Sequence, residues 1–293
     1  MIIDSHAHYA HPRFHAEFPY LCVRDGAFAV DRSNRDQLLE EMDRNRIVGV
    51  IEPSIGFDAI EKQNELVLAN RGRMWAAIGV HPTRCVRTAW KNRTRLAAYA
   101  ETVGAVAIGE TGLDYHYPRK EQYRLRQKRW FVYQIKLADR LQKPLILHIR
   151  AADRDAIRIL KRYRRRLHGG AVHCFVGDRG LAQEYLRLGF SIGIGGKLFD
   201  SDAAGEALRD AVAHIPLDRL LVETDAPFVL PPLEDGLCSG NQRKRLCNAS
   251  LILPAVIQRI AELRREDART VEDAIYQNTV RVFGLDMEGE RHE

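Results

Sequence analysis

Short runs of β-branched and other apolar residues recur along the chain and alternate with amphipathic stretches. The runs are MIID (1–4), IVGVIE (47–52), MWAAIGV (74–80), AVAIG (105–109), PLILHI (144–149), GAVHCF (170–175), FSIGIG (190–195) and RLLVET (219–224). Apolar residues spaced by three and four predict helices over 35–45, 58–71, 120–142, 153–166, 178–188, 203–213, 249–265 and 270–283. Alternating strands and helices indicate a parallel sheet with helical crossovers, and a closed barrel needs eight strands. We therefore predict an α/β fold of the (β/α)8 TIM-barrel type.

Two irregular segments interrupt this alternation. Residues 9–34 follow the first predicted strand, and residues 226–248 follow the last and are rich in proline and glycine. Both are predicted to be long loops, because proline and glycine break regular structure. In a barrel these loops would lie at the C-terminal face, where active sites are built.

The length and composition favour a single globular domain. The chain has 293 residues, of which 45% are hydrophobic and 29% are charged, and we predict one domain over 1–293. No apolar run approaches the roughly 20 residues of a membrane span, and the start MIIDSHAH lacks the pattern of a signal peptide. Five cysteines without C-x-x-C spacing indicate reduced thiols. We expect a cytoplasmic protein that does not associate with membranes.

A net charge of +6 favours polyanionic partners, of which nucleic acid is the one we predict. The run KRYRRR at 161–166 fits a solvated helix face, whereas QRKR at 242–245 falls in the loop after the last strand and is predicted to follow a nucleic-acid backbone. Candidate platforms for stacked bases, with core packing as the alternative, are Tyr115, Tyr117, Phe199 and Phe228.

Side chains that commonly bind metals stand at the ends of five predicted strands. His6 and His8 are separated by one residue, so both imidazoles lie on one side of an extended strand. The other candidates, each at or just after the end of its strand, are Glu110, His148, His173 and Asp225. The alternative is that the histidines are hydrogen-bonded core residues and the carboxylates are helix N-caps. Burying all six without a cation would be costly, so we predict a metal centre at the C-terminal face.

Six ligands exceed the needs of one tetrahedral ion, so we predict two divalent metals, with Glu110 as the bridging carboxylate. Two metals would lower the pKa of a bound water to about 7 and suit the hydrolysis of a phosphodiester. Asp225 is the candidate general base. Imidazole and carboxylate ligands are compatible with Zn²⁺, Mn²⁺, Fe²⁺ or Mg²⁺.

The chain resembles the TatD family of metal-dependent deoxyribonucleases within the amidohydrolase-like barrels. The matching segments are DSHAH (4–8), GVHP (79–82), AIGETGLDY (107–115), QIKLADRLQKPLILHIR (134–150), VHCFVG (172–177) and LLVETDAPF (220–228). The resemblance implies a two-metal ligand set that falls on the same six residues: His6, His8, Glu110, His148, His173 and Asp225. It also implies that His81 and Arg150 contact the substrate phosphate. The expected activity is that of a DNA exonuclease.

Two departures from the family pattern bear on the choice of substrate. Val176 stands where the family usually has a serine, and Asn248, Ala249 and Ser250 align with its usual Asn-Glu-Pro run. Two other functions therefore stay open: hydrolysis of a small ester, lactone or amide, and DNA binding with weak turnover.

Overall fold

A computed structural model describes residues 1–116 and 121–287 of the chain. Its main sheet has eight strands whose order in the sheet is their order in the chain. The strands are β1 (Ile2–Asp4), β4 (Ile47–Pro53), β5 (Met74–Ile78), β6 (Ala107–Asp114), β7 (Leu145–Arg150), β8 (Gly170–Val172), β9 (Phe190–Ile194) and β10 (Leu220–Val222). Each of the eight overlaps a predicted apolar run, but β6 continues five residues beyond the predicted end at 109 and β8 ends three residues before the predicted end at 175.

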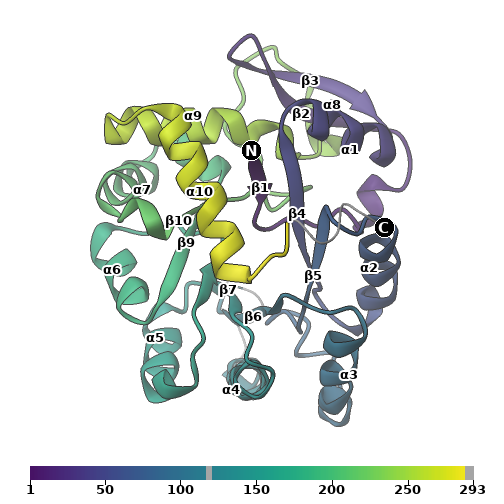
Figure 1. The fold of residues 1–293 in the computed structure, drawn as a ribbon, viewed down its shortest axis with the longest axis vertical. Coiled ribbons are helices and arrows are strands. Elements are labelled where there is room, and N and C mark those ends of the chain that lie inside the picture. The colour runs from purple at the N-terminus through teal and green to yellow at the C-terminus, as the bar shows by residue number, and fades with distance from the viewer. Residues whose placement is uncertain (117–120, 288–293) are drawn as a thin grey trace. The chain divides into compact units, whose positions relative to one another are not determined.

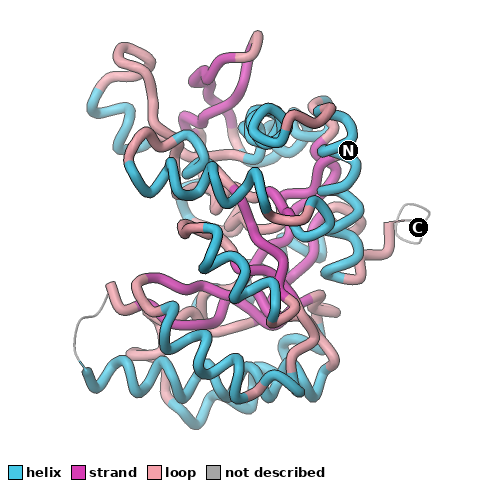
Figure 2. The backbone as a smooth tube through the Cα atoms, turned by 90° about the vertical axis from the view of Figure 1, so that its left-hand side faces the viewer, coloured by secondary structure: helices cyan, strands magenta, loops and turns pink. Residues whose placement is uncertain are grey.

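Helices separate successive strands, as Figures 1 and 2 show. They are α1 (Arg35–Arg44), α2 (Phe57–Ala69), α3 (Arg95–Thr102), α4 (Glu121–Leu141), α5 (Asp153–Arg162), α6 (Arg179–Arg187), α7 (Ala203–His214), α8 (Gly240–Arg245), α9 (Leu253–Arg264) and α10 (Ala268–Phe283). The first and last strands are also joined directly, because Ser5 N donates to Val222 O at 3.0 Å. The predicted (β/α)8 fold is confirmed. No helix in the described part of the chain combines the length and apolar character that a membrane span requires.

Several predicted element boundaries were wrong. The helix predicted over 153–166 ends at Arg162 and is followed by a separate 3-10 turn, Arg164–Arg166. The helix predicted over 249–265 begins as a 3-10 turn before α9. Helix α3 was missed, and the predicted start of α4 at residue 120 lies outside the described residues.

Residues 9–34 are not a long loop, because they contain an antiparallel hairpin of β2 (Phe18–Arg24) and β3 (Ala27–Ser33). Its two-residue turn is Asp25-Gly26, with φ angles of 51° and 80°. Both φ angles are positive, which is the geometry that favours Asp-Gly in tight hairpins. The segment 226–248 is also partly regular, since it contains α8.

The described residues form two compact units. Unit 1 comprises 1–51, 174–183 and 193–279, and unit 2 comprises 52–173, 184–192 and the chain from 280 onward. In unit 1, α9 packs against α7 and β10. In unit 2, α2 packs on β5, α4 on β6 and α5 on β7. Each unit carries part of the candidate chemistry.

Candidate metal centre

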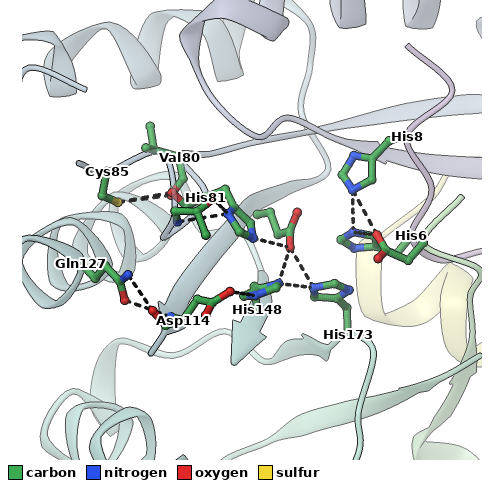
Figure 3. Close-up of polar contacts among 12 residues, drawn as sticks. His6, His8, Val80, His81, Cys85, Asp114, Gln127, His148 and His173 are labelled. Carbon is green, nitrogen blue, oxygen red and sulfur yellow. Dashed lines mark hydrogen bonds and ion pairs between the residues drawn. The ribbon is translucent and has the colours of Figure 1, made fainter. Parts of the chain in front are cut away.

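Unit 1 brings His6, His8 and Asp225 together, and Figure 3 labels the two histidines. The two histidines follow β1, and Asp225 follows β10. The Nε2 atoms of His6 and His8 are 3.2 Å apart, and Asp225 Oδ1 lies 3.5 Å from the first and 3.3 Å from the second. The His6 side chain is fully buried, whereas that of Asp225 is 17% exposed. Three donor atoms of this triad therefore face one point that water can reach from the Asp225 side.

A buried carboxylate, Asp4, holds the backbone on both sides of this triad. Its Oδ1 accepts hydrogen bonds from His6 N and Thr224 N, each at 3.1 Å. Its Oδ2 accepts from Thr224 Oγ1 and Ser250 Oγ, each at 2.6 Å. Burial raises the pKa of Asp4 to about 7 despite these hydrogen bonds. Asp4 thus links β1, which leads to His6, with the residue that precedes Asp225.

The backbone at Asp225 adopts a conformation that side-chain-bearing residues rarely take. Its φ angle is +54°, in the left-handed region. Two hydrogen bonds hold it there: Asp225 N donates to His6 O at 2.9 Å, and Phe228 N donates to Asp225 O at 2.8 Å. Such conformations cost on the order of 1 kcal/mol or more and persist at functional sites where neighbours enforce them.

Unit 2 brings Glu110, His148 and His173 together, and Figure 3 labels the two histidines. Glu110 Oε1 lies 2.8 Å from His148 Nδ1 and 2.8 Å from His173 Nε2, and these two nitrogens are 3.0 Å apart. His173 directly follows β8, whereas Glu110 lies in the middle of β6 and His148 lies two residues before the end of β7, so these two are not at the strand ends where the sequence placed them. Parallel pairing of β6 with β7 and of β7 with β8 brings their carboxyl ends to one edge.

The imidazoles around Glu110 keep it ionised. Burial alone would raise the pKa of this carboxyl, but the nearby imidazoles lower it well below its usual range. His81 and His173 lower the pKa of Glu110 electrostatically, and His148 and His173 also donate hydrogen bonds to the carboxylate. An ionised carboxylate almost fully removed from water is suited to binding a cation.

Asp114 orients His148 from the side opposite to Glu110. Its Oδ2 lies 3.2 Å from His148 Nε2, while the other ring nitrogen faces Glu110 (Figure 3). Asp114 is itself fixed, because its N and O pair with the Gln127 side chain at 2.9 and 2.8 Å. Burial lowers the pKa of His148, but its hydrogen bonds to Asp114 and Glu110 outweigh burial and raise it. A carboxylate behind a histidine in this way holds a hydrogen on Nε2, so that Nδ1 can release its own proton and ligate when a cation binds.

His81 lies beside the same cluster with a different tautomer. Its Nδ1 accepts a hydrogen bond from Thr83 N at 3.2 Å and lies 2.6 Å from Thr83 Oγ1. In the neutral ring Nε2 then carries the hydrogen, and it faces Glu110 Oε1 at 3.4 Å. Burial lowers the pKa of His81, which favours this neutral form. His81 is therefore set up as a hydrogen-bond donor rather than as a ligand.

Both triads have the dimensions of a metal site. Nitrogen and oxygen ligands at about 2.0–2.1 Å from a tetrahedral ion are roughly 3.3 Å from one another. The donor atoms are 3.2–3.5 Å apart in unit 1 and 2.8–3.0 Å apart in unit 2. A mixed imidazole and carboxylate set fits a divalent transition metal.

Each of the six predicted ligands belongs to one of the two triads, three to each. His81 lies next to Glu110. Arg150, the other predicted phosphate contact, ends β7 with its side chain exposed. Sequence reasoning missed Asp4 and Asp114 as residues that hold the ligands. Asp4 ends both the predicted run and β1, so its signal was present, whereas Asp114 ends β6 five residues beyond the predicted run and was hidden by that wrong boundary.

The two basic runs differ in position. The run at 161–166 lines a hollow of about 650 Å³, with Lys161 and Arg166 paired to Glu184 and Asp139. It precedes β8, whereas His173 follows β8, so the hollow and the Glu110 cluster lie at opposite ends of this strand. The second run forms most of α8, whose cationic side chains are exposed.

Comparison with known proteins shows the family of the chain. The family model described as TatD related DNase matches residues 3–284. A protein named 3'-5' ssDNA/RNA exonuclease TatD from Musicola paradisiaca is 32% identical over 260 residues, which cover 88% of this chain and 95% of that protein. A protein of the same name from Erwinia amylovora is 35% identical over 256 residues, which cover 86% and 94%.

Among solved structures, a TatD homologue from Escherichia coli is 27% identical, with a TM-score of 0.77 over 97% of this chain and 98% of that one. The similarity thus extends over the whole described fold and both triads. This chain belongs to the TatD family of related DNases.

Proposed function

We propose that this protein is a divalent-metal-dependent exonuclease that hydrolyses phosphodiester bonds at the 3' end of single-stranded DNA or RNA. The observation that carries the proposal is the His6, His8 and Asp225 triad, with its metal-site spacing, in a chain of the TatD family. The curated relatives named above supply the substrate class and the polarity. We further propose that both compact units work as one catalytic domain, which the family match over residues 3–284 supports.

We propose one divalent ion for each triad, held by His6, His8 and Asp225 in unit 1 and by Glu110, His148 and His173 in unit 2. The donor spacing and the ionised, buried Glu110 support this assignment. When bound, such ions lower the pKa of water and neutralise charge on the phosphate. The role of Glu110 as a bridge and the identity of the metal stay predictions.

The chain's own residues supply the proton transfer and the hold on the substrate. The Asp225 carboxylate is the proposed general base, and its partial exposure lets a water approach it. The His81 Nε2 hydrogen is the proposed donor to a phosphate oxygen, and the exposed Arg150 guanidinium is the proposed second phosphate contact. The predicted cytoplasmic location remains a prediction.

The test compares wild type with Asp225→Asn on a single-stranded oligonucleotide labelled at its 5' end, with Mn²⁺, Mg²⁺ or Zn²⁺ added to metal-free protein. A general base contributes about 10²- to 10⁴-fold, so we expect the variant to lose at least about 100-fold in kcat. Asp235→Asn is the matched control, because Asp235 is an exposed carboxylate of the same loop. Equal degradation by wild type and Asp225→Asn would refute the mechanism.

A further inference from the structure

Phe228 exposes an aromatic ring beside the unit 1 triad. Its side chain is 41% exposed, and it is the one aromatic among the large hydrophobic side chains that stand exposed in the described residues. Its ring centroid lies 6.2 Å from that of His8 and 5.1 Å from that of His11. Both imidazoles meet the ring at steep angles, 66° and 74°, so neither is stacked parallel to it. An exposed aromatic ring next to a candidate ligand offers a face on which a base can stack.

The turn that carries Phe228 is held by hydrogen bonds on both sides. Asn248 N donates to Pro227 O at 3.1 Å, and Asn248 Nδ2 donates to Val229 O at 3.1 Å. The Phe228 amide itself donates to Asp225 O at 2.8 Å. The ring is therefore presented from a fixed backbone, which reduces the entropy lost when a ligand stacks on it.

The other candidate platforms are already occupied. The Tyr115 hydroxyl donates to Asp155 at 2.7 Å, and the Arg124 guanidinium lies over its ring at 4.5 Å. Phe199 packs against Phe28 at a centroid distance of 5.2 Å. Tyr117 lies outside the described residues. Phe228 is thus the aromatic that the described geometry favours.

Cationic side chains lie on α8, which leads into Asn248. Helix α8 ends at Arg245, three residues before Asn248, and its last turn carries Arg243, Lys244 and Arg245, all exposed. Arg13, from the segment after β1, donates to Lys244 O at 2.7 Å and ties α8 to that segment. A basic segment that ends three residues before Asn248, which holds the turn of an exposed aromatic, matches the chemistry of a single-stranded nucleic acid, which offers a phosphate and a base at every step.

We infer that Phe228 is the floor of a nucleobase subsite, on which the base next to the cleaved phosphodiester stacks, and that the cations of α8 bind the phosphates further along the strand. This inference rests on the proposed nuclease function. It assigns the base of the substrate to Phe228 and the phosphates of the substrate to α8. Stacking tolerates all bases because every base has a π face, so the subsite accepts DNA and RNA of any sequence.

The stacking test replaces Phe228 by alanine and by tryptophan. Two oligonucleotides are compared, one ending in natural nucleotides and one ending in abasic residues with the same backbone. Base stacking on one aromatic ring corresponds to about 5-fold to 100-fold in affinity. We expect Phe228→Ala to raise KM for the natural end by at least about 5-fold with little change in kcat. We expect Phe228→Trp to have a KM close to that of the wild type. On the abasic end, Phe228→Ala and wild type should be equal.

The matched control is Leu68→Ala, which removes a side chain of similar exposure, 42%, from α2 in unit 2 and should leave both substrates unaffected. An unchanged KM for the natural end in Phe228→Ala, or an equal loss on the abasic end, would overturn the subsite.

Binding without turnover separates this inference from the nuclease proposal. A 2-aminopurine base at the 3' end, bound in the presence of a chelator, should lose fluorescence on wild type and keep it on Phe228→Ala. That result supports the subsite even if no hydrolysis is found, whereas binding to wild type without quenching contradicts it.

The proposed binding of phosphates by α8 is tested by the salt dependence of the affinity for single-stranded DNA. Each phosphate neutralised on a single strand contributes about −0.7 to the slope of log K against log salt. The triple variant Arg243→Ala, Lys244→Ala, Arg245→Ala should make this slope shallower by about 1 to 2. The double variant Arg164→Ala, Arg165→Ala, which removes two exposed arginines from the other basic run, is the charge control and should not. An unchanged slope in the triple variant would exclude α8 from the binding path.

Discussion

Replacing Asp114 by asparagine tests how the unit 2 triad is kept ready for a metal. Asparagine keeps the size of the side chain. It also keeps an oxygen that can accept the hydrogen bond from His116 N, which in the wild type is 2.8 Å from Asp114 Oδ1. The substitution removes the negative charge that lies 3.2 Å from His148 Nε2. The charged partner holds a hydrogen on Nε2, so that Nδ1, which faces Glu110, can release its own proton and ligate when a metal binds.

Loss of a carboxylate behind a ligating histidine typically costs 10- to 100-fold in metal affinity, or about 1.4 to 2.7 kcal/mol. The upper end applies if the hydrogen bond is charge-assisted, since such bonds are worth about 1.5–3 kcal/mol. We therefore expect Asp114→Asn to weaken one of the two bound ions by 10- to 100-fold and to leave the other unchanged. Activity should return at high metal concentration.

The assay titrates metal-free protein with Mn²⁺ or Zn²⁺ in competition with a chelating dye and resolves the two binding steps. Asp153→Asn is the control, because Asp153 accepts a hydrogen bond from Tyr185 at 2.8 Å and contacts no candidate ligand in the described residues. Unchanged affinity of both steps in Asp114→Asn, or an equal loss in Asp153→Asn, would refute the reasoning.

Two further predictions concern stability. Ser250→Ala removes the 2.6 Å hydrogen bond to Asp4 from a fully buried pair. It should lower the free energy of unfolding, measured by urea denaturation, by about 1–3 kcal/mol. An unchanged midpoint of the urea transition would contradict the role given to Asp4. Gly170→Ala should prevent soluble expression or lower the melting temperature sharply, because φ is +128° and an added Cβ would lie 1.9 Å from Leu145 O. Gly26→Ala is its control, since φ there is +80° with no atom within 4 Å, and the strain alone should cost about 1 kcal/mol; similar losses in both would disprove the clash.

The hairpin of β2 and β3 shows why part of the fold escaped prediction. Five successive residues of β2, from Phe18 to Cys22, are buried, so the alternation of apolar and polar residues that marks a strand is hidden. The Asp25-Gly26 turn was the available signal. Helix α8 was missed for a different reason, because its six residues are all polar or glycine and have no apolar face.

The residue types at the strand ends were determined by the sequence alone. Eight apolar runs alternating with amphipathic helices specify parallel strands, and in parallel strands the carboxyl ends share one edge. That rule was enough to select all six candidate ligands, since it depends on the order of elements and not on their exact register.

Only the tertiary structure decided how these side chains pair. Asp4 meets Ser250 across 246 positions of sequence, and His148 turns one ring nitrogen to Asp114 and the other to Glu110. Such contacts depend on strand register, rotamers and loop paths, each of which is set by packing between segments far apart in the chain. A pattern read along one segment carries no information about the groups that the rest of the chain brings to it.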